Sequence, residues 1–194
     1  MNQSIVERVI NLAVEIQQIP SPTFHETRRA EFVGRNFYNL GLQDSFKDES
    51  GNVYACLKGR GEIQPVVVTA HLDTVFPEGT DLSGMRTIEK ITGPGIGDNS
   101  LGLAGLFGLY WALRGTRSGQ REDRLLPGDV WLVANVGEEG LGDLKGMKSV
   151  VNRFQGNVLA YIILEGMSLG QIYHRGLGVC RYEISVDTKG GIPG

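Results

Sequence analysis

Acidic and histidine side chains follow short apolar runs at four places in this chain of 194 residues. The runs end near residues 70, 97, 136 and 164. An open α/β sheet delivers the residues at the carboxyl ends of its strands into one shared crevice. Carboxylates and an imidazole gathered there are ligands for divalent metals, so the pattern predicts a metal site, with two ions.

The apolar segments predict an α/β fold. Apolar residues at helical spacing predict helices over 4–19, 26–40, 99–113 and 144–154, with Thr23 placed to cap the second. Strands are predicted over 52–57, 66–70, 129–136 and 158–164, the last of these in the centre of the sheet. We expect a mixed, mainly parallel central sheet flanked by helices.

The last part of the chain differs in character. Val179, Tyr182, Ile184 and Val186 stand among polar neighbours, which predicts a strand with one wet face, as in an antiparallel sheet. We therefore place a domain boundary near residues 170–178, with a first domain over 1–175 and the start of a second over 176–194.

Composition excludes several classes of function. A net charge of −3 with scattered basic residues provides no basic patch for nucleic acid. The longest apolar stretch is far shorter than the ~20 residues that a membrane span needs, and charges near the N-terminus argue against an export signal. Cys56 and Cys180 lie on separate predicted strands, so we expect buried, reduced thiols in a cytoplasmic protein.

The segment His71-Leu72-Asp73 ends the apolar run at 66–70. Alternation along an extended backbone places His71 and Asp73 on the same side, where the carboxylate can orient a metal-bound imidazole. The alternative is a strand-end histidine whose ring is satisfied by a turn, and the motif by itself favours that alternative.

Asp98 lies in a glycine-rich segment just ahead of a predicted helix. It can cap that helix or bridge two cations with its two oxygens. The glycines also suggest a nucleotide-binding loop. Ser100 stands where the G-x-G-x-x-G pattern needs its third glycine, however, and no phosphate loop is present in the sequence, so we disfavour that function.

Glu138 and Glu139 are adjacent acids after a buried strand, and their mutual repulsion calls for compensation. Coordination of a metal by one and proton transfer by the other would provide it, whereas the alternative is a solvated surface turn. Glu165 follows a very apolar strand, where burial of an unpaired charge would cost several kcal/mol.

Together these motifs resemble those of the co-catalytic zinc metallo-exopeptidases and amide deacylases, which include tripeptidase T, glutamate carboxypeptidase, acetylornithine deacetylase and aminoacylase. The resemblance rests on His71-Leu72-Asp73-Thr74-Val75, Gly97-Asp98-Asn99, Glu138-Glu139-Gly140 and Glu165-Gly166, in the same order and at similar spacing. The segments 69–71 and 94–108 are most similar to the tripeptidase T-like branch.

The resemblance implies a role for each residue. His71, Asp98 and Glu165 would hold one zinc ion, and Asp98 would bridge to a second ion bound by Glu139. Asp73 would orient His71. Glu138 would be the general base that deprotonates water between the metals, with Co²⁺ or Mn²⁺ as alternatives to Zn²⁺.

The chain also departs from the family pattern, which includes a further histidine ligand near the C-terminus and an inserted α+β lid domain. Neither His25 nor His174 can be assigned that role by similarity. The paired glycines Gly190-Gly191 match the start of the lid, so residues 1–175 resemble the N-terminal part of the catalytic domain and 176–194 the first lid strand. We therefore expect an exposed sheet edge, weak binding of the second metal and little activity from this chain alone.

Three functions remain to be compared. The leading one is a metal-dependent hydrolase of small peptides or N-acyl amino acids, acting without nucleic acid or membrane. The second is a non-catalytic metal-binding remnant, or a half-enzyme that needs a complementary C-terminal chain or a homo-oligomer. The third is a nucleotide-binding α/β module, which would bind dinucleotides and no metal.

Overall fold

A mixed five-stranded sheet forms the centre of the computed structural model, which describes residues 4–42, 44–115, 126–166, 170–176, 178, 180, 182 and 184–188. In spatial order its strands are β1 (Phe46–Lys47), β2 (Val53–Leu57), β6 (Val130–Asn135), β3 (Val66–His71) and β7 (Ala160–Ile163). Strands β6, β3 and β7 run parallel, whereas β1 and β2 form the antiparallel side. The predicted mixed sheet is confirmed, and the carboxyl ends of its three parallel strands meet at one edge.

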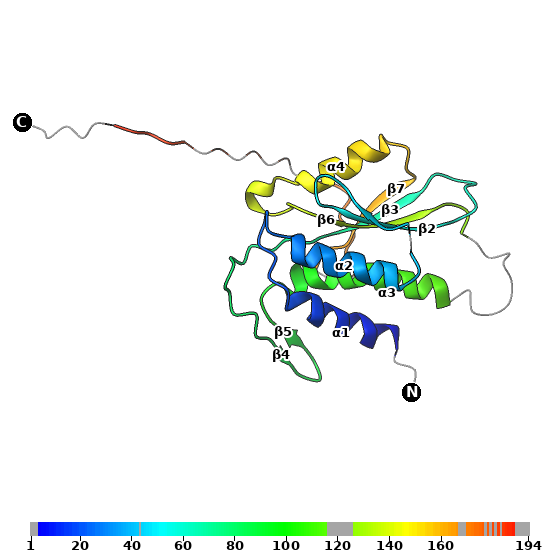
Figure 1. Cartoon of the computed structure of the whole chain (residues 1–194), viewed down its shortest axis with the longest axis horizontal. Helices are drawn as coiled ribbons and strands as arrows, with labels where there is room; N and C mark the ends of the chain where they lie inside the picture. Colours follow the sequence, from blue (N-terminus) through cyan, green and yellow to red (C-terminus); the bar gives the residue numbers. More distant parts are fainter. Residues whose placement is uncertain are drawn as a thin grey trace, which may run out of the picture.

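Helices cover both faces of this sheet (Figure 1). Three of them, α1 (Ile5–Gln17), α2 (Thr27–Asn39) and α3 (Gly102–Gly115), lie on one face, and α4 (Lys145–Phe154) lies on the other. The larger apolar core fills the space between the sheet and the three helices, and a smaller one lies beneath α4. A two-stranded sheet of β4 (Met85–Arg86) and β5 (Ile91–Thr92) lies beside α1.

Local sequence explains the start of α1 but not that of α2. Ser4 and Glu7 form a reciprocal capping box at the start of α1, which satisfies two backbone N–H groups that the helix leaves free. The expected cap at Thr23 is wrong, because α2 begins after Glu26 and the Thr23 hydroxyl instead donates to the Asp73 carboxylate at 2.9 Å. Tertiary contact therefore overrides the local capping preference of Thr23.

Helix α3 packs through small residues, as its glycine-rich sequence indicates. A Cβ atom on Gly108 would lie 2.6 Å from Cγ2 of Val9, so α1 and α3 approach too closely for a larger residue there. The helix begins at Gly102 rather than at residue 99, because Asn99 acts as its cap and accepts the Gly102 N–H at 3.0 Å. A short irregular π-helical turn, Ile96–Leu101, precedes it.

Two sequence predictions about the sheet are wrong. The strand predicted over 158–164 lies at the edge of the described sheet, with Ile162 and Ile163 about half exposed (47% and 52%), because no described strand covers its outer side. The alternating strand predicted over 179–187 is not formed by its described residues. Tyr182, Ile184 and Val186 are exposed and lie outside helices and strands, since no described neighbour pairs with their backbone.

The C-terminal predictions are tested only in part. Val179 and residues 189–194, with Gly190-Gly191, lie outside the described residues, so the domain division at 175/176 stays a prediction. Cys56 is buried and free as expected, but Cys180 is exposed and outside any strand. In the part of the chain that the structure describes, no helix combines the length and apolarity required to cross a bilayer.

Candidate metal centre

The carboxyl ends of the parallel strands bring the predicted site residues together. His71 is the last residue of β3, Glu138 and Glu139 follow β6, and Glu165 follows β7. Asp98 comes from the irregular turn ahead of α3. Among the described residues, two groups each offer ligand atoms within 4.8 Å of one another: His71 with Asp98 and Glu165, and His71 with Glu138 and Glu139.

His71 is common to both groups and is almost fully buried. Its Nε2 lies 2.8 Å from Oδ1 of Asp98 and 3.7 Å from Oε2 of Glu165. Its Nδ1 lies 3.4 Å from Oδ1 of Asp73 without forming a well-directed hydrogen bond. The ring is therefore surrounded by carboxylates and is not satisfied by a local turn, which removes the alternative explanation of this strand-end histidine.

Asp73 links the histidine to the acidic pair. Its side chain is fully buried, and its two oxygens accept the backbone N–H groups of Glu138 at 3.0 Å and of Glu139 at 2.9 Å. A third hydrogen bond comes from the Thr23 hydroxyl. Asp73 therefore holds the loop after β6 against the end of β3, a role beyond the orientation of His71 that the sequence predicted.

Arg29 supports the same strand end, and sequence analysis missed it. Its buried guanidinium donates through Nη1 to the Leu72 carbonyl at 2.9 Å and through Nε and Nη2 to the Ile19 carbonyl. Burial lowers the pKa of Arg29 to about 10, although the nearby Asp73 charge opposes this shift. The spacing of Arg29 in the sequence could have indicated its burial, because Arg29, Val33 and Phe37 recur every four residues on the buried face of α2.

Close backbone contact brings Asp98 beside Glu165. A Cβ atom on Gly166 would lie only 1.9 Å from the Gly97 carbonyl oxygen, so the two segments touch through their main chains. Asn99, fully buried, donates from Nδ2 to the Leu164 carbonyl at 2.8 Å. Since Asn99 caps α3, the side chain of Asp98 is left for the site, which answers the question of whether Asp98 is a helix cap.

The buried charges perturb one another strongly. Burial would lower the pKa of His71, but interactions with Asp73, Asp98 and Glu165 outweigh it and raise that pKa to about 12. Burial tends to raise the pKa of Asp73, yet His71 and the two backbone N–H groups hold it below its ordinary value. The hydrogen bond with His71 likewise lowers the pKa of Asp98.

Glu138 and Glu139 are shifted in the opposite direction. Burial is the main cause for both, and neighbouring carboxylates raise the two pKa values further. Neither residue forms an ion pair with a lysine or arginine among the described residues. Both are half-buried, so the pair is more enclosed than a solvated surface turn.

This donor set fits a divalent cation. Four carboxylates from three separate segments surround one imidazole, and apart from His71 no cationic side chain of the described residues pairs with them. Like charges gathered in a partly buried space repel one another unless a cation compensates them. Hard oxygen ligands with one imidazole suit zinc, cobalt or manganese.

The other two histidines lie outside this centre. His25 and His174 are exposed, and neither belongs to a described group with metal-binding geometry. The described residues therefore bring a single imidazole to the site.

Comparison with known proteins identifies the family. Residues 52–172 match Peptidase family M28, a span that contains every predicted site residue. The chain belongs to peptidase family M28. This confirms the expected relationship to the zinc exopeptidases, and it removes the basis for a nucleotide-binding module.

Relatives of this M28 chain are distant and longer. It is 28% identical over 147 residues to YqjE of Bacillus subtilis, a protein without a characterised function, covering 69% of this chain and 37% of YqjE. It is 35% identical over 69 residues to a protein of Pyrococcus furiosus named as a LysW-lysine/LysW-ornithine hydrolase, covering 36% of this chain and 20% of that protein. The M28 chain thus spans well under half the length of these relatives.

A solved structure shares the fold. The aminopeptidase PepT from Bacillus cereus superposes with a TM-score of 0.66 at 24% identity, over 82% of this chain and 43% of that one. At this identity the likeness concerns the arrangement of the M28 fold, with its mixed sheet and flanking helices.

Proposed function

We propose that this chain carries the metal-binding and proton-transfer groups of a zinc-dependent hydrolase for peptide or N-acyl amide bonds. The observation that carries the proposal is the convergence of His71, at the end of β3, with carboxylates from the ends of β6 and β7 and from the turn before α3. Membership of a peptidase family supports hydrolysis as the reaction. The names of the hydrolase and aminopeptidase relatives support a peptide or amide bond as the target.

His71, Asp98 and Glu165 would hold one ion, and Asp98 with Glu139 would hold a second. Divalent ions bound there would polarise the scissile carbonyl and lower the pKa of the attacking water. Asp98 suits a bridging position because its side chain is 64% exposed and one oxygen remains beyond the contact with His71. Asp73 lies 3.4 Å from Nδ1 of His71, on the other side of the ring from Asp98 and Glu165, where it would orient the imidazole.

Glu138 would be the general base. It takes a proton from the water that attacks the carbonyl carbon, and it passes that proton to the amine nitrogen as the C–N bond breaks. Burial raises the pKa of Glu138 above that of an exposed glutamate. Its backbone N–H is bound by Asp73, which limits the directions that the side chain can take.

The substrates we propose are small peptides and N-acyl amino acids, handled in the cytoplasm. Because the described residues bring one imidazole to the site, a non-catalytic metal-binding protein, or a half-enzyme completed by another chain or a second copy, is the alternative. The hydrolase and its alternative both require a metal bound by His71, but only the hydrolase turns over substrate by itself.

The test combines metal binding with turnover. Purified chain is titrated with Zn²⁺ by calorimetry and then assayed with tripeptides and N-acetyl amino acids, alongside Glu138→Gln. We expect metal binding in both proteins and any turnover to be lost in Glu138→Gln. Absence of zinc binding by the wild-type chain would refute the proposed function. Turnover as fast as that of full-length relatives would refute the half-enzyme alternative.

A further inference from the structure

Glu26 is a buried carboxylate that the proposed mechanism does not use. Its residue is 7% exposed, and among the described residues no lysine or arginine forms an ion pair with it. It occupies the N-cap position of α2, yet its side chain makes no capping hydrogen bond to that helix. A buried charge without a cationic partner and without a helix to cap is unfavourable unless other hydrogen bonds compensate it.

Those hydrogen bonds lead to the acidic pair. Oε1 of Glu26 accepts the backbone N–H of Gly137 at 3.0 Å, across 111 residues of sequence, and that of Phe24 at 3.0 Å. Gly137 directly precedes Glu138 and has a left-handed backbone, with φ of +60°. The contact with Gly137 is buried, so water does not compete with it freely.

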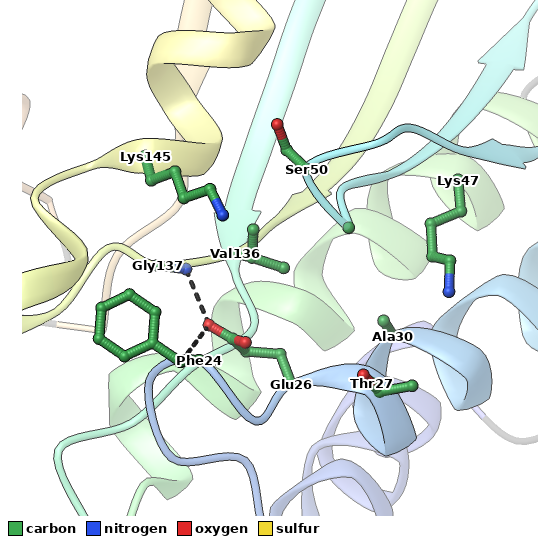
Figure 2. A pocket seen from close by; sticks show the side chains of 10 residues that line it. Phe24, Glu26, Thr27, Ala30, Lys47, Ser50, Val136, Gly137 and Lys145 are labelled. Carbon is green, nitrogen blue, oxygen red and sulfur yellow. Dashed lines mark hydrogen bonds between the residues drawn. The ribbon is translucent and has the colours of Figure 1, made fainter.

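Figure 2 shows Glu26 among the residues that line a pocket of about 200 Å³. Lys47 and Lys145 line the pocket on opposite sides, and the two hydrogen bonds of Glu26 run to Gly137 and Phe24. Neither lysine comes within ion-pair distance of the carboxylate in the described structure. Backbone amides therefore hold the charge of Glu26 in place.

Two carboxylates thus bind three consecutive amides. Glu26 takes the N–H of Gly137, and Asp73 takes those of Glu138 and Glu139. Fixing consecutive peptide planes fixes the direction in which the Glu138 and Glu139 side chains leave the backbone. Asp73 does this from the β3 side, and Glu26 does it from the α2 side.

We propose that Glu26 is a positioning residue for the Glu138–Glu139 pair. By holding the Gly137 peptide, it sets the start of the loop that aims Glu138 at the attacking water and Glu139 at the metal. The functional part of this inference rests on the proposed function, whereas the structural part concerns the Gly137 peptide alone.

Amide hydrogen exchange of Gly137 tests the structural part directly. In the full chain, NMR should show exchange of the Gly137 N–H at least about tenfold faster in Glu26→Ala than in wild type. Glu26→Gln should restore most of the protection, because its Oε1 still accepts the hydrogen bond. Glu31→Ala, an exposed glutamate on the same helix, is the matched control and should leave Gly137 unchanged.

Cobalt binding and kinetics test the functional part. With Co²⁺ in place of zinc, Glu26→Ala should alter the visible absorption of the bound ion, and Glu26→Gln should resemble wild type. In any assay that detects turnover, Glu26→Ala should lower kcat by about 10- to 100-fold with little change in KM.

The outcomes are separable. Wild-type Gly137 exchange and an unchanged cobalt spectrum in Glu26→Ala would overturn the inference. If Glu26→Ala fails to fold, Glu26→Gln becomes decisive: protected Gly137 and a wild-type cobalt spectrum support the inference, whereas loss of both overturns it. Failure of wild type to bind cobalt would refute the proposed function, but the Gly137 exchange would still report whether Glu26 holds the peptide.

Discussion

The carboxylate of Asp73 accepts the backbone N–H of Glu138 at 3.0 Å, although 65 residues separate the two in sequence. The same carboxylate binds the N–H of Glu139 and lies beside His71. The histidine and the acidic pair are therefore coupled through one buried side chain. A change at Asp73 affects both the stability of the fold and the geometry of the candidate site.

We predict that Asp73→Asn lowers the free energy of unfolding by about 1–3 kcal/mol. The amide nitrogen of asparagine cannot accept a hydrogen bond, so one partly buried N–H of the loop after β6 loses its partner. Urea unfolding at neutral pH measures the change. Asp81→Asn is the control, because Asp81 is exposed, and its effect should stay within about 0.5 kcal/mol. Equal destabilisation by the two variants would contradict the role given to Asp73.

Cys56 provides a prediction about pH. Burial, with a smaller contribution from Asp129, raises its pKa to about 12 from an ordinary value of 9.0. Because the thiolate is the reactive form, a thiol reagent at pH 8 should modify the exposed Cys180 quickly and Cys56 only after unfolding. Cys180→Ser should abolish the fast reaction, and a fast second thiol in the folded wild-type chain would contradict the prediction.

The same shift has a consequence for stability. Between pH 9 and pH 12 the folded chain keeps the Cys56 proton that the unfolded chain has lost. The contribution of the Cys56 thiol to the free energy of unfolding should therefore be fully present below pH 9. Above pH 9 it should fall, by up to about 1.4 kcal/mol per pH unit. Comparison of the urea midpoints of wild type and Cys56→Ala between pH 8 and pH 10 measures this slope.

Sequence could predict that the candidate site residues lie at the ends of strands, because strand ends are set locally. Uniformly apolar runs fix β3 and β6, and the polar residue that ends each run must emerge at the sheet edge. The positions of His71 and of the Glu138–Glu139 pair at the sheet edge can be predicted in this way. The position of β7 at the edge does not, because its neighbours depend on the whole sheet rather than on the apolar character of residues 158–164.

The groups that support the site could not be predicted from sequence, because their contacts span the fold. Thr23 looks like a helix cap but donates to Asp73, and Glu26 stands at a cap position but binds Gly137. Arg29 carries a charge on a buried helix face and is satisfied by carbonyls at Ile19 and Leu72. Local sequence suggests an exposed or helix-capping role for each of these residues. Their actual hydrogen bonds depend on segments that only tertiary packing brings together.

Metal stoichiometry should separate the two ligand groups. In the proposed arrangement His71 is a ligand of the first ion and Glu139 of the second, so His71→Ala should remove the first, tighter equivalent, whereas Glu139→Gln should weaken only the second, weaker one. Calorimetric titration of chelator-stripped protein at neutral pH measures both. His25→Ala serves as the control, since His25 is exposed and outside the described groups. Full zinc binding by His71→Ala would rule out a metal centre at the end of β3.

The contact between Gly97 and Gly166 gives the last prediction. An added Cβ on Gly166 would lie 1.9 Å from the Gly97 carbonyl oxygen, which is far inside contact distance, so the backbone must move. Because Asp98 and Glu165 adjoin these glycines, Gly166→Ala should separate the two carboxylates. We expect a loss of about 1–3 kcal/mol in unfolding free energy and about 10- to 100-fold weaker binding of the first zinc ion.

Gly176→Ala is the matched control for this variant. A Cβ at Gly176 would meet no heavy atom within 4 Å, so the same change in composition should leave zinc affinity and stability as in wild type. Zinc titration and urea unfolding of the two variants side by side therefore isolate the steric effect. Zinc binding by Gly166→Ala as tight as that by Gly176→Ala would contradict the prediction. In that case the hydrogen bond from Asn99 to the Leu164 carbonyl, rather than the close approach of the two main chains, would bring Asp98 and Glu165 together.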